Sequence, residues 1–227
     1  MSKYTSLWTA YPLYSSTISG DYSSDWKFNP SIDEDLQVNV KSNSYGSNYN
    51  NSTYSRGHIV PDADRSGDAT MISQAYYLTN QTPQIQNGFN GTIWNQLEQA
   101  VRNVANATDT VYVVSGATFQ KKGGNETIKY LTADNSSIKP EKVPIPNYFW
   151  KVLLKVSRSG TKITGASAIG IWFEHKAYSD NDWASHVCTV DEIEGYTGYD
   201  FFVNLPDELE SSAEGLSNWN NFSNFNK

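Results

Sequence analysis

The chain has 227 residues and a mass of 25.4 kDa, which fits one large domain or two small ones. No linker rich in Pro, Gly or Ser separates two hydrophobic halves, so we expect a single domain over residues 1–227. The 17 Lys and Arg against 24 Asp and Glu give a net charge of −7, which argues against a protein that coats nucleic acid through a broad basic face. Any phosphate-binding site would have to be local.

The single cysteine, Cys188, excludes an intrachain disulfide and a zinc site built from several thiolates. We expect this side chain to be a small buried hydrophobe, and any metal to be held by oxygen or imidazole ligands. No run reaches the ~18 apolar residues of a membrane span. Residues 1–20 lack the apolar block of a signal peptide, but the Asn, Ser, Tyr and Thr content is typical of an extracellular or periplasmic surface. We therefore expect a secreted or periplasmic protein whose signal peptide is absent from this sequence.

The first half of the chain contains little periodicity before its one clear helix. Leu7–Leu13 reads as an early strand, and residues 15–57 as a long polar excursion interrupted by Pro30 and glycines. Within it, Asn43–Thr53 is the most biased segment and predicts a solvated loop. In Gly88–Asn106 the apolar residues recur at helical spacing, which predicts an amphipathic helix.

The second half is dominated by β-branched and aromatic runs separated by Gly and Pro. These runs predict strands over 110–119, 148–156 and 166–173, followed by a short helix at Asp191–Gly195 with Thr189 as its N-cap. Strands outnumber helices and do not alternate with them regularly. The prediction is therefore an α+β fold with a central, largely antiparallel sheet flanked by helices.

His58, in the triplet Arg56-Gly57-His58, is the first candidate for chemistry. An imidazole can accept a proton near neutral pH, and a glycine allows the backbone to approach a ligand closely. A general base beside an arginine suits the attack of water on a phosphate. Taken alone the triplet is weak, because a lone histidine is more often structural or simply exposed.

Asn90, Trp94, Glu98 and Arg102 follow at four-residue spacing, so on one helix they would drift slowly across neighbouring faces. Glu98 and Arg102 could then pair. Asn90 and Glu98 are separated by a rise of about 12 Å, too far to ligate one ion directly, so we expect Asn90 to bind the ion and Glu98 to hold its water. The alternative is a helix cap at Asn90 with a surface ion pair behind it.

A single amide ligand with water completing the shell matches magnesium, which gives up its waters reluctantly. A rival metal pair could be built from His175 and His186, with Glu174 nearby. No further ligand lies at metal-site spacing, so we interpret these two as surface or strand-end histidines.

Several blocks resemble one family. Ser55-Arg56-Gly57-His58 resembles the Asp-Arg-Gly-His signature of the DNA/RNA non-specific endonucleases, which carry a ββα-metal motif. Asn80-Gln81-Thr82-Pro83-Gln84 and the block from Asn90 to Glu98 are similar to that family's Asn-x-x-Pro-Gln and Asn-x-x-x-Trp-x-x-Leu-Glu. Further similarity follows in family order, through 7–13, 112–119, 143–151, 189–194 and 197–206.

The resemblance implies a sugar- and sequence-non-specific endonuclease that hydrolyses DNA and RNA to 5′-phosphate ends. His58 would be the general base, Asn90 would bind Mg²⁺, with Mn²⁺ as a substitute, and Glu98 would order the water shell of the ion. Arg56 and Arg102 would face phosphate oxygens, and we add Arg65 and Asn80 as substrate-binding candidates. The partners would be DNA and RNA backbones without a membrane; a homodimer and an inhibitor protein are left open.

The chain departs from the family pattern at two places. Ser55 occupies the position of the usual first Asp, which affects how the turn is held rather than the base. Around Asp25-Trp26-Lys27 relatives often carry an additional arginine that is missing here. Lys27 or Arg65 would then have to replace it, or the charge of the transition state would be less well stabilised.

Two rival functions stay open at this level. The many tyrosines and tryptophans could line the platform of an extracellular carbohydrate-binding module without catalysis. A phosphodiesterase acting on small nucleotides would share the chemistry but not the substrate.

Overall fold

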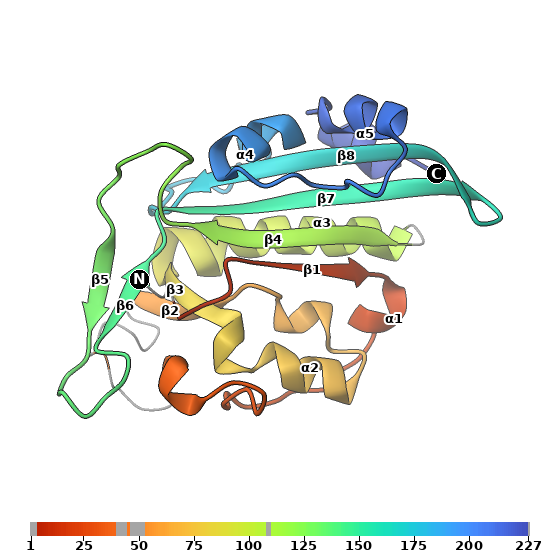
Figure 1. Ribbon diagram of the computed structural model, residues 1–227. Helices are drawn as coiled ribbons and strands as arrows, with labels where there is room; N and C mark the ends of the chain where they lie inside the picture. The colour runs from red at the N-terminus through yellow and green to blue at the C-terminus, as the bar shows by residue number, and fades with distance from the viewer. Residues whose placement is uncertain (1–3, 40–44, 46–52, 108–109, 227) are drawn as a thin grey trace.

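A five-stranded antiparallel sheet lies at the centre of the protein, in the order β1-β4-β7-β8-β9 (Figure 1). The computed structural model describes residues 4–39, 45, 53–107 and 110–226. The strands of this sheet are β1 (Trp8–Leu13), β4 (Val111–Thr118), β7 (Tyr148–Ser159), β8 (Lys162–Glu174) and β9 (Val187–Cys188). The predicted strands at 7–13, 110–119, 148–156 and 166–173 are confirmed, and with them the α+β class.

Both faces of this sheet are covered, and the central strand β7 shows why. Alternate residues of a strand point to opposite faces. Phe149 and Leu153 belong to one hydrophobic cluster, whereas Trp150, Val152 and Leu154 belong to a second. A strand that is apolar on both faces must lie between two layers, so the sheet needs helices on each side.

The first face is covered by α3 (Asn95–Ala107) and the helical segment before it, η5 (Gln86–Trp94). α4 (Val190–Thr197) and α5 (Asp207–Glu214) cover the second face (Figure 1). α6 (Trp219–Asn224) adds Phe222 to the first cluster. The predicted cap of α4 is confirmed, because the Thr189 side chain accepts a hydrogen bond from the backbone of Glu192. None of the described helices is long and apolar enough to cross a membrane.

The helix predicted at Gly88–Asn106 is confirmed from Phe89 onward, but the chain kinks before it. Asn87 and Gly88 have non-helical backbone angles, and Gly88 has a φ of 82°. A side chain is strained in that conformation, and a Cβ at Gly88 would also lie 2.8 Å from Cβ of Ala177. The glycine therefore allows a sharp entry into the helix.

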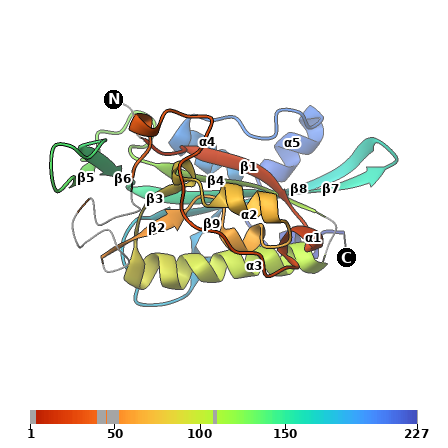
Figure 2. The ribbon, with the colours of Figure 1, turned by 90° about the horizontal axis from the view of Figure 1, so that it is seen from below.

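A separate two-stranded ribbon is formed by β2 (Tyr54–His58) and β3 (Gln81–Ile85), which lie beside the start of α3 (Figure 2). The prediction of an unstructured excursion over 15–57 is wrong at both ends, where α1 (Ser15–Ile18) and β2 lie. In β2 the buried positions are Ser55 and Gly57 rather than apolar residues, so hydrophobic alternation could not reveal the strand. Most of the loop predicted at Asn43–Thr53 lies outside the described residues.

The remaining elements complete the outer layer. They are η1 (Glu34–Leu36), η3 (Asp62–Asp64), α2 (Ala69–Ala75), η4 (Leu78–Asn80), β5 (Lys129–Thr132), β6 (Lys142–Ile145) and η6 (Trp183–His186). The hairpin of β5 and β6 packs on a third, smaller cluster that includes Leu131, Val143 and Leu78.

Candidate functional site

The ribbon of β2 and β3 directs Arg56 and His58 to the same side. The two residues are two apart in β2 and pair with Pro83 and Gln81 of β3. Gly57, between them, faces the opposite side, where a Cβ would clash with the Gln84 side chain. The glycine of the triplet is therefore required by close packing between the strands.

The His58 imidazole is held between two aromatic rings. Its centroid lies 4.5 Å from that of Trp26 and 5.0 Å from that of Tyr76. Its Nε2 atom is buried and has no hydrogen-bond partner among the described residues. Burial lowers the pKa of His58 to about 4, although the negative charge of Asp62 opposes the shift. The ring is therefore neutral near pH 7 and can accept a proton.

Asn90 lies in the middle of the Gln86–Trp94 segment, which contacts both β2 and β3. Asn90 is not the cap of this helix, because it lies inside the helical segment that follows the kink at Asn87 and Gly88. Its amide nitrogen donates to Oε1 of Gln86 at 3.4 Å, and no described residue donates to its carbonyl oxygen. That oxygen is available to bind a cation.

Glu98 lies two turns further along, and its charge interacts with that of Lys151, a residue of β7 that was not among the predicted site residues. Burial raises the pKa of Glu98 to about 7, an effect that the charge of Lys151 opposes and that of Asp64 reinforces. Lys151 is only 1% exposed and donates to Oγ of Ser115 at 3.0 Å. Burial lowers the pKa of Lys151 from its ordinary value. The signal for this lysine was a charged residue in the middle of an apolar strand.

Arg102 does not form the expected ion pair with Glu98. Its Nη1 atom lies 2.9 Å from Oδ1 of Asp64, whose Oδ2 accepts a hydrogen bond of 2.7 Å from the Tyr11 hydroxyl. The Asp64 side chain is 4% exposed and that of Arg102 is 15% exposed, so this is no surface pair either. Asp64 lies in the turn after β2, a contact across 38 residues that helical spacing could not predict.

Asn80 and Arg65, two further candidates, are engaged in the fold. The Asn80 side chain donates to the carbonyls of Val60 and Ala75 and accepts from the Val60 amide. The Arg65 guanidinium lies 4.6 Å over the Tyr11 ring and donates to the carbonyl of Pro12 at 3.2 Å. These contacts favour a structural role for both residues.

The segment Asp25-Trp26-Lys27, where the motif pattern has an additional arginine, lies next to His58. The Trp26 ring packs against His58 at an interplanar angle of 34°, and the Arg56 guanidinium lies 5.7 Å from the centroid of the Trp26 ring. Lys27 donates instead to the Ser73 hydroxyl. The aromatic ring of Trp26 thus supports both the imidazole and the guanidinium.

The other two histidines do not form a metal pair. His175 follows β8 directly, its Nε2 accepts a hydrogen bond of 2.8 Å from the Ile85 amide, and its Nδ1 lies 2.7 Å from the carbonyl of Pro146. His186 ends a short turn and stacks on Phe173.

Cys188 is partly buried against the second cluster, and burial raises the pKa of its thiol to about 12.

His175 makes the stability of the protein depend on pH. Burial lowers its pKa to about 4, below the value of about 6.5 expected in the unfolded chain. The stability that depends on the neutral ring is complete above pH 6.5 and is lost as the pH falls toward 4, by about 1.4 kcal/mol per pH unit. We expect His175→Asn to flatten the fall of the unfolding free energy between pH 6.5 and 4, measured by urea denaturation. Parallel curves for the two proteins would contradict this assignment.

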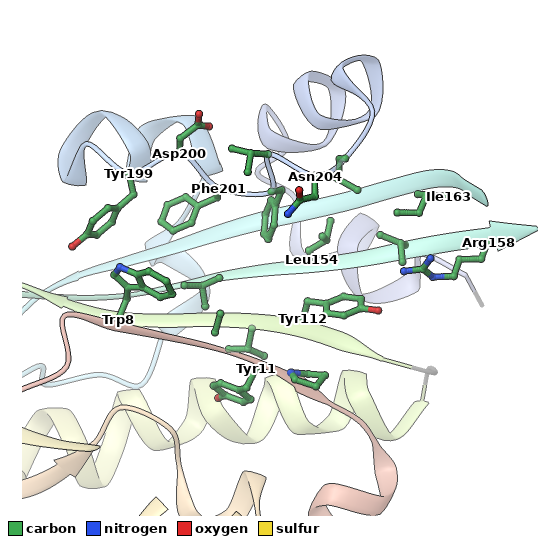
Figure 3. A pocket seen from close by; sticks show the side chains of 18 residues that line it. Trp8, Tyr11, Tyr112, Leu154, Arg158, Ile163, Tyr199, Asp200, Phe201 and Asn204 are labelled. Carbon is green, nitrogen blue, oxygen red and sulfur yellow. The ribbon is translucent and has the colours of Figure 1, made fainter. Parts of the chain in front are cut away.

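A large apolar groove of about 650 Å³ lies on the other face of the sheet (Figure 3). Strands β1, β4 and β7 form one wall through residues such as Trp8, Tyr112 and Leu154, and residues 199–205 form the other. Tyr112 and Leu154 border or belong to the cluster covered by α4 and α5, whereas Ile59, next to His58, lies in the cluster under α3. The sheet therefore lies between the groove and the candidate catalytic residues around His58.

The unit formed by β2, β3 and the helical stretch of η5 and α3 carries a neutral imidazole, a free amide oxygen, an acid and two guanidinium groups. Residues 1–208 match the sequence profile of the DNA/RNA non-specific endonucleases. A nuclease of Nostoc sp. is 30% identical over 223 residues, covering 94% of this chain and 72% of that protein. Nuclease 1, mitochondrial, of Schizosaccharomyces pombe is 27% identical, covering 70% of this chain but only 49% of that protein.

The solved structure of an endonuclease G in complex with its inhibitor EndoGI is similar in fold. It has a TM-score of 0.70, 22% sequence identity, and coverage of 89% of this chain and 80% of that chain. The chain belongs to the DNA/RNA non-specific endonuclease family. It is a nucleic-acid hydrolase of a metal-dependent class, and the resemblance seen in its motifs is confirmed.

Proposed function

We propose that the protein is a Mg²⁺-dependent endonuclease that cleaves DNA and RNA without regard to sugar or sequence and leaves 5′-phosphate ends. The observation that carries this proposal is the buried, unpartnered Nε2 of His58 on the same strand-strand-helix unit as the free carbonyl oxygen of Asn90. A neutral base and a hard oxygen ligand are the two groups that water attack on a phosphodiester requires.

His58 would remove the proton from the attacking water. Its neutral state near pH 7 allows this, and the rings of Trp26 and Tyr76 restrict its orientation. The water oxygen would form the new bond to phosphorus while the bond from phosphorus to the 3′ oxygen breaks. The phosphate then stays on the 5′ end of the product.

The residues present suit a magnesium ion, with Mn²⁺ as a substitute. Asn90 would hold it through its carbonyl oxygen, and Glu98 would accept hydrogen bonds from the waters around it. When bound, the ion supplies positive charge that stabilises the phosphorane-like transition state and the departing 3′ oxygen. An adjacent dication would also favour the ionised form of Glu98, whose pKa burial raises to about 7.

Arg56 and Arg102 would bind phosphate oxygens and reverse the negative field of the chain locally. Arg102 uses Nη1 for Asp64, and its other N–H groups have no partner among the described residues. Because such contacts are made to the backbone, they carry no sequence information. Arg65 and Asn80 would act indirectly, by holding the segments around the site.

Asn90→Ala and Arg102→Ala should fail in different ways. Loss of the carbonyl oxygen should raise the Mg²⁺ concentration needed for half-maximal nicking, by about tenfold or more. Loss of the guanidinium should lower kcat/KM on plasmid DNA with a smaller change in the Mg²⁺ requirement. Full Mg²⁺ titrations of both variants measure this, and equal shifts would show that the two roles have been confused.

The substrate class is tested by comparing long DNA with bis-p-nitrophenyl phosphate. A nuclease should prefer the polymer, because several phosphates contact the protein. A preference for the small ester by orders of magnitude would favour the small-nucleotide phosphodiesterase. If the wild type cleaves neither substrate with any divalent ion, the carbohydrate-binding alternative gains support. Secretion, suggested by the composition, is part of the same proposal.

A further inference from the structure

Three carboxylates converge on the far side of the sheet, where α4 meets α5. Asp191 and Glu194 lie three residues apart on one face of α4, and Glu214 is the last residue of α5. One ligand oxygen from each side chain can be chosen so that all three lie within 4.8 Å of one another. Among the described residues no other group of three or more acids, histidines or cysteines is this close.

Glu214 distinguishes this cluster from ordinary surface acids. The residue is only 6% exposed, and its Oε1 atom is buried without a hydrogen-bond partner among the described residues. None of the salt bridges in the described part of the chain involves Asp191, Glu194 or Glu214. A buried carboxylate without a donor or a cation costs free energy, so Glu214 must either keep a proton or bind a cation.

The charges around the cluster are of one sign. Burial raises the pKa of Glu214 to about 8, and the negative charges of Glu194, Glu210, Asp191 and Asp200 add to the shift. The C-terminal end of α5, where Glu214 lies, adds the negative end of a helix dipole. Cations are favoured at such a position, and no basic side chain contributes to the shift of Glu214.

The geometry also suits a shared ion. Ca²⁺ binds carboxylate oxygens at 2.3–2.6 Å, so two oxygens on one ion are separated by at most about 5 Å. Glu194 uses Oε1 to accept the Phe201 amide at 2.6 Å, which leaves its Oε2 for a ligand. Ligands made of oxygen alone favour a hard cation over zinc.

We propose that Asp191, Glu194 and Glu214 bind a hard divalent cation, preferentially Ca²⁺, that fastens α5 to α4. Up to five carboxylate oxygens and added water meet the coordination number of Ca²⁺, whereas Mg²⁺ demands a stricter octahedral shell. The site lies across the sheet from His58 and Asn90, so the ion would be structural and separate from the ion of the nuclease site.

Thermal unfolding of the full chain in chelator, in CaCl₂ and in MgCl₂ tests the proposal, with calorimetric titration of CaCl₂ as a direct measure of binding. At about a hundredfold excess over Kd we expect Ca²⁺ to raise Tm by roughly 5–10 °C. Mg²⁺ at the same concentration should give a smaller rise. The reverse order would overturn the choice of Ca²⁺.

Glu214→Gln gives the decisive comparison. In chelator this variant should melt at or above the temperature of the wild type, because it removes repulsion, and Ca²⁺ should leave its Tm unchanged. Glu208→Gln, an exposed acid in the first turn of α5, is the matched control and should keep the full shift. Asn90→Ala should also keep it, which separates this ion from the nuclease site.

Three results would overturn the proposal. The first is a wild type with neither a Tm shift nor heat of binding in CaCl₂, which is the result expected if Glu214 keeps a proton. The second is a Glu214→Gln variant that retains the Tm shift. The third is an Asn90→Ala variant that loses the Tm shift, which would place the ion in the nuclease site instead.

Discussion

His58→Ala should abolish Mg²⁺-dependent nicking of plasmid DNA, with a loss of about 10²- to 10⁴-fold in rate. His58 has a buried Nε2 without a partner and a pKa that keeps the ring neutral near pH 7, so no other described histidine can replace it. His175 uses both ring nitrogens in the fold, and His186 stacks on Phe173. The measurement is the initial rate of conversion of supercoiled to nicked plasmid.

Two controls separate chemistry from folding in this experiment. The circular dichroism spectrum of His58→Ala should match that of the wild type, and His58→Gln, which restores volume without a base, should stay inactive. His186→Ala should keep nicking, since that ring lies outside the proposed machinery. Undiminished cleavage by His58→Ala would refute the assignment of the general base.

Asp64→Ala should destabilise the protein by about 3–5 kcal/mol, because it leaves the Arg102 charge without its partner in a largely buried position. The Tyr11 hydroxyl loses its acceptor as well, at 2.7 Å from Oδ2. The free energy of unfolding in urea measures the loss. We also expect weaker nicking, since Arg102 would no longer be held in place.

Tyr11→Phe is the matched control for Asp64→Ala. It removes a single hydrogen bond from the same carboxylate and should cost about 1 kcal/mol. Adding Arg102→Leu to Asp64→Ala should recover part of the lost stability, because the unpaired charge is removed. A loss below 1 kcal/mol for Asp64→Ala would show that the Asp64–Arg102 pair contributes little.

The long elements were predictable because hydrophobic periodicity reports burial directly. The strands around Val113, Leu153 and Ile169 and the helix through Leu97 and Val101 carry the apolar pattern that their layers require. β2 was not predicted as a strand, because its buried positions are a serine and a glycine. Only the sequence motif around His58 indicated that this segment belongs to the site.

The candidate residues themselves could also be predicted, because the triplet at His58, the amide at Asn90 and the acid at Glu98 are local features of the chain. The residues that contact them could not be predicted. Asp64 pairs with Arg102 across 38 residues, and the charge of Lys151, from a strand far along the chain, acts on Glu98. Contacts of this kind depend on how layers pack, which periodicity does not encode.

By itself, then, the sequence determined the α+β class, the family and the residues that carry the proposed hydrolysis. Hydrophobic periodicity and short motifs both depend on residues that are close together in the sequence. Only the tertiary structure decided that Arg102 pairs with Asp64, that Trp26 supports His58, and that Glu214 meets Asp191 behind the sheet. Those pairings arise when distant segments share one layer, where burial and charge act between groups that the chain itself keeps far apart.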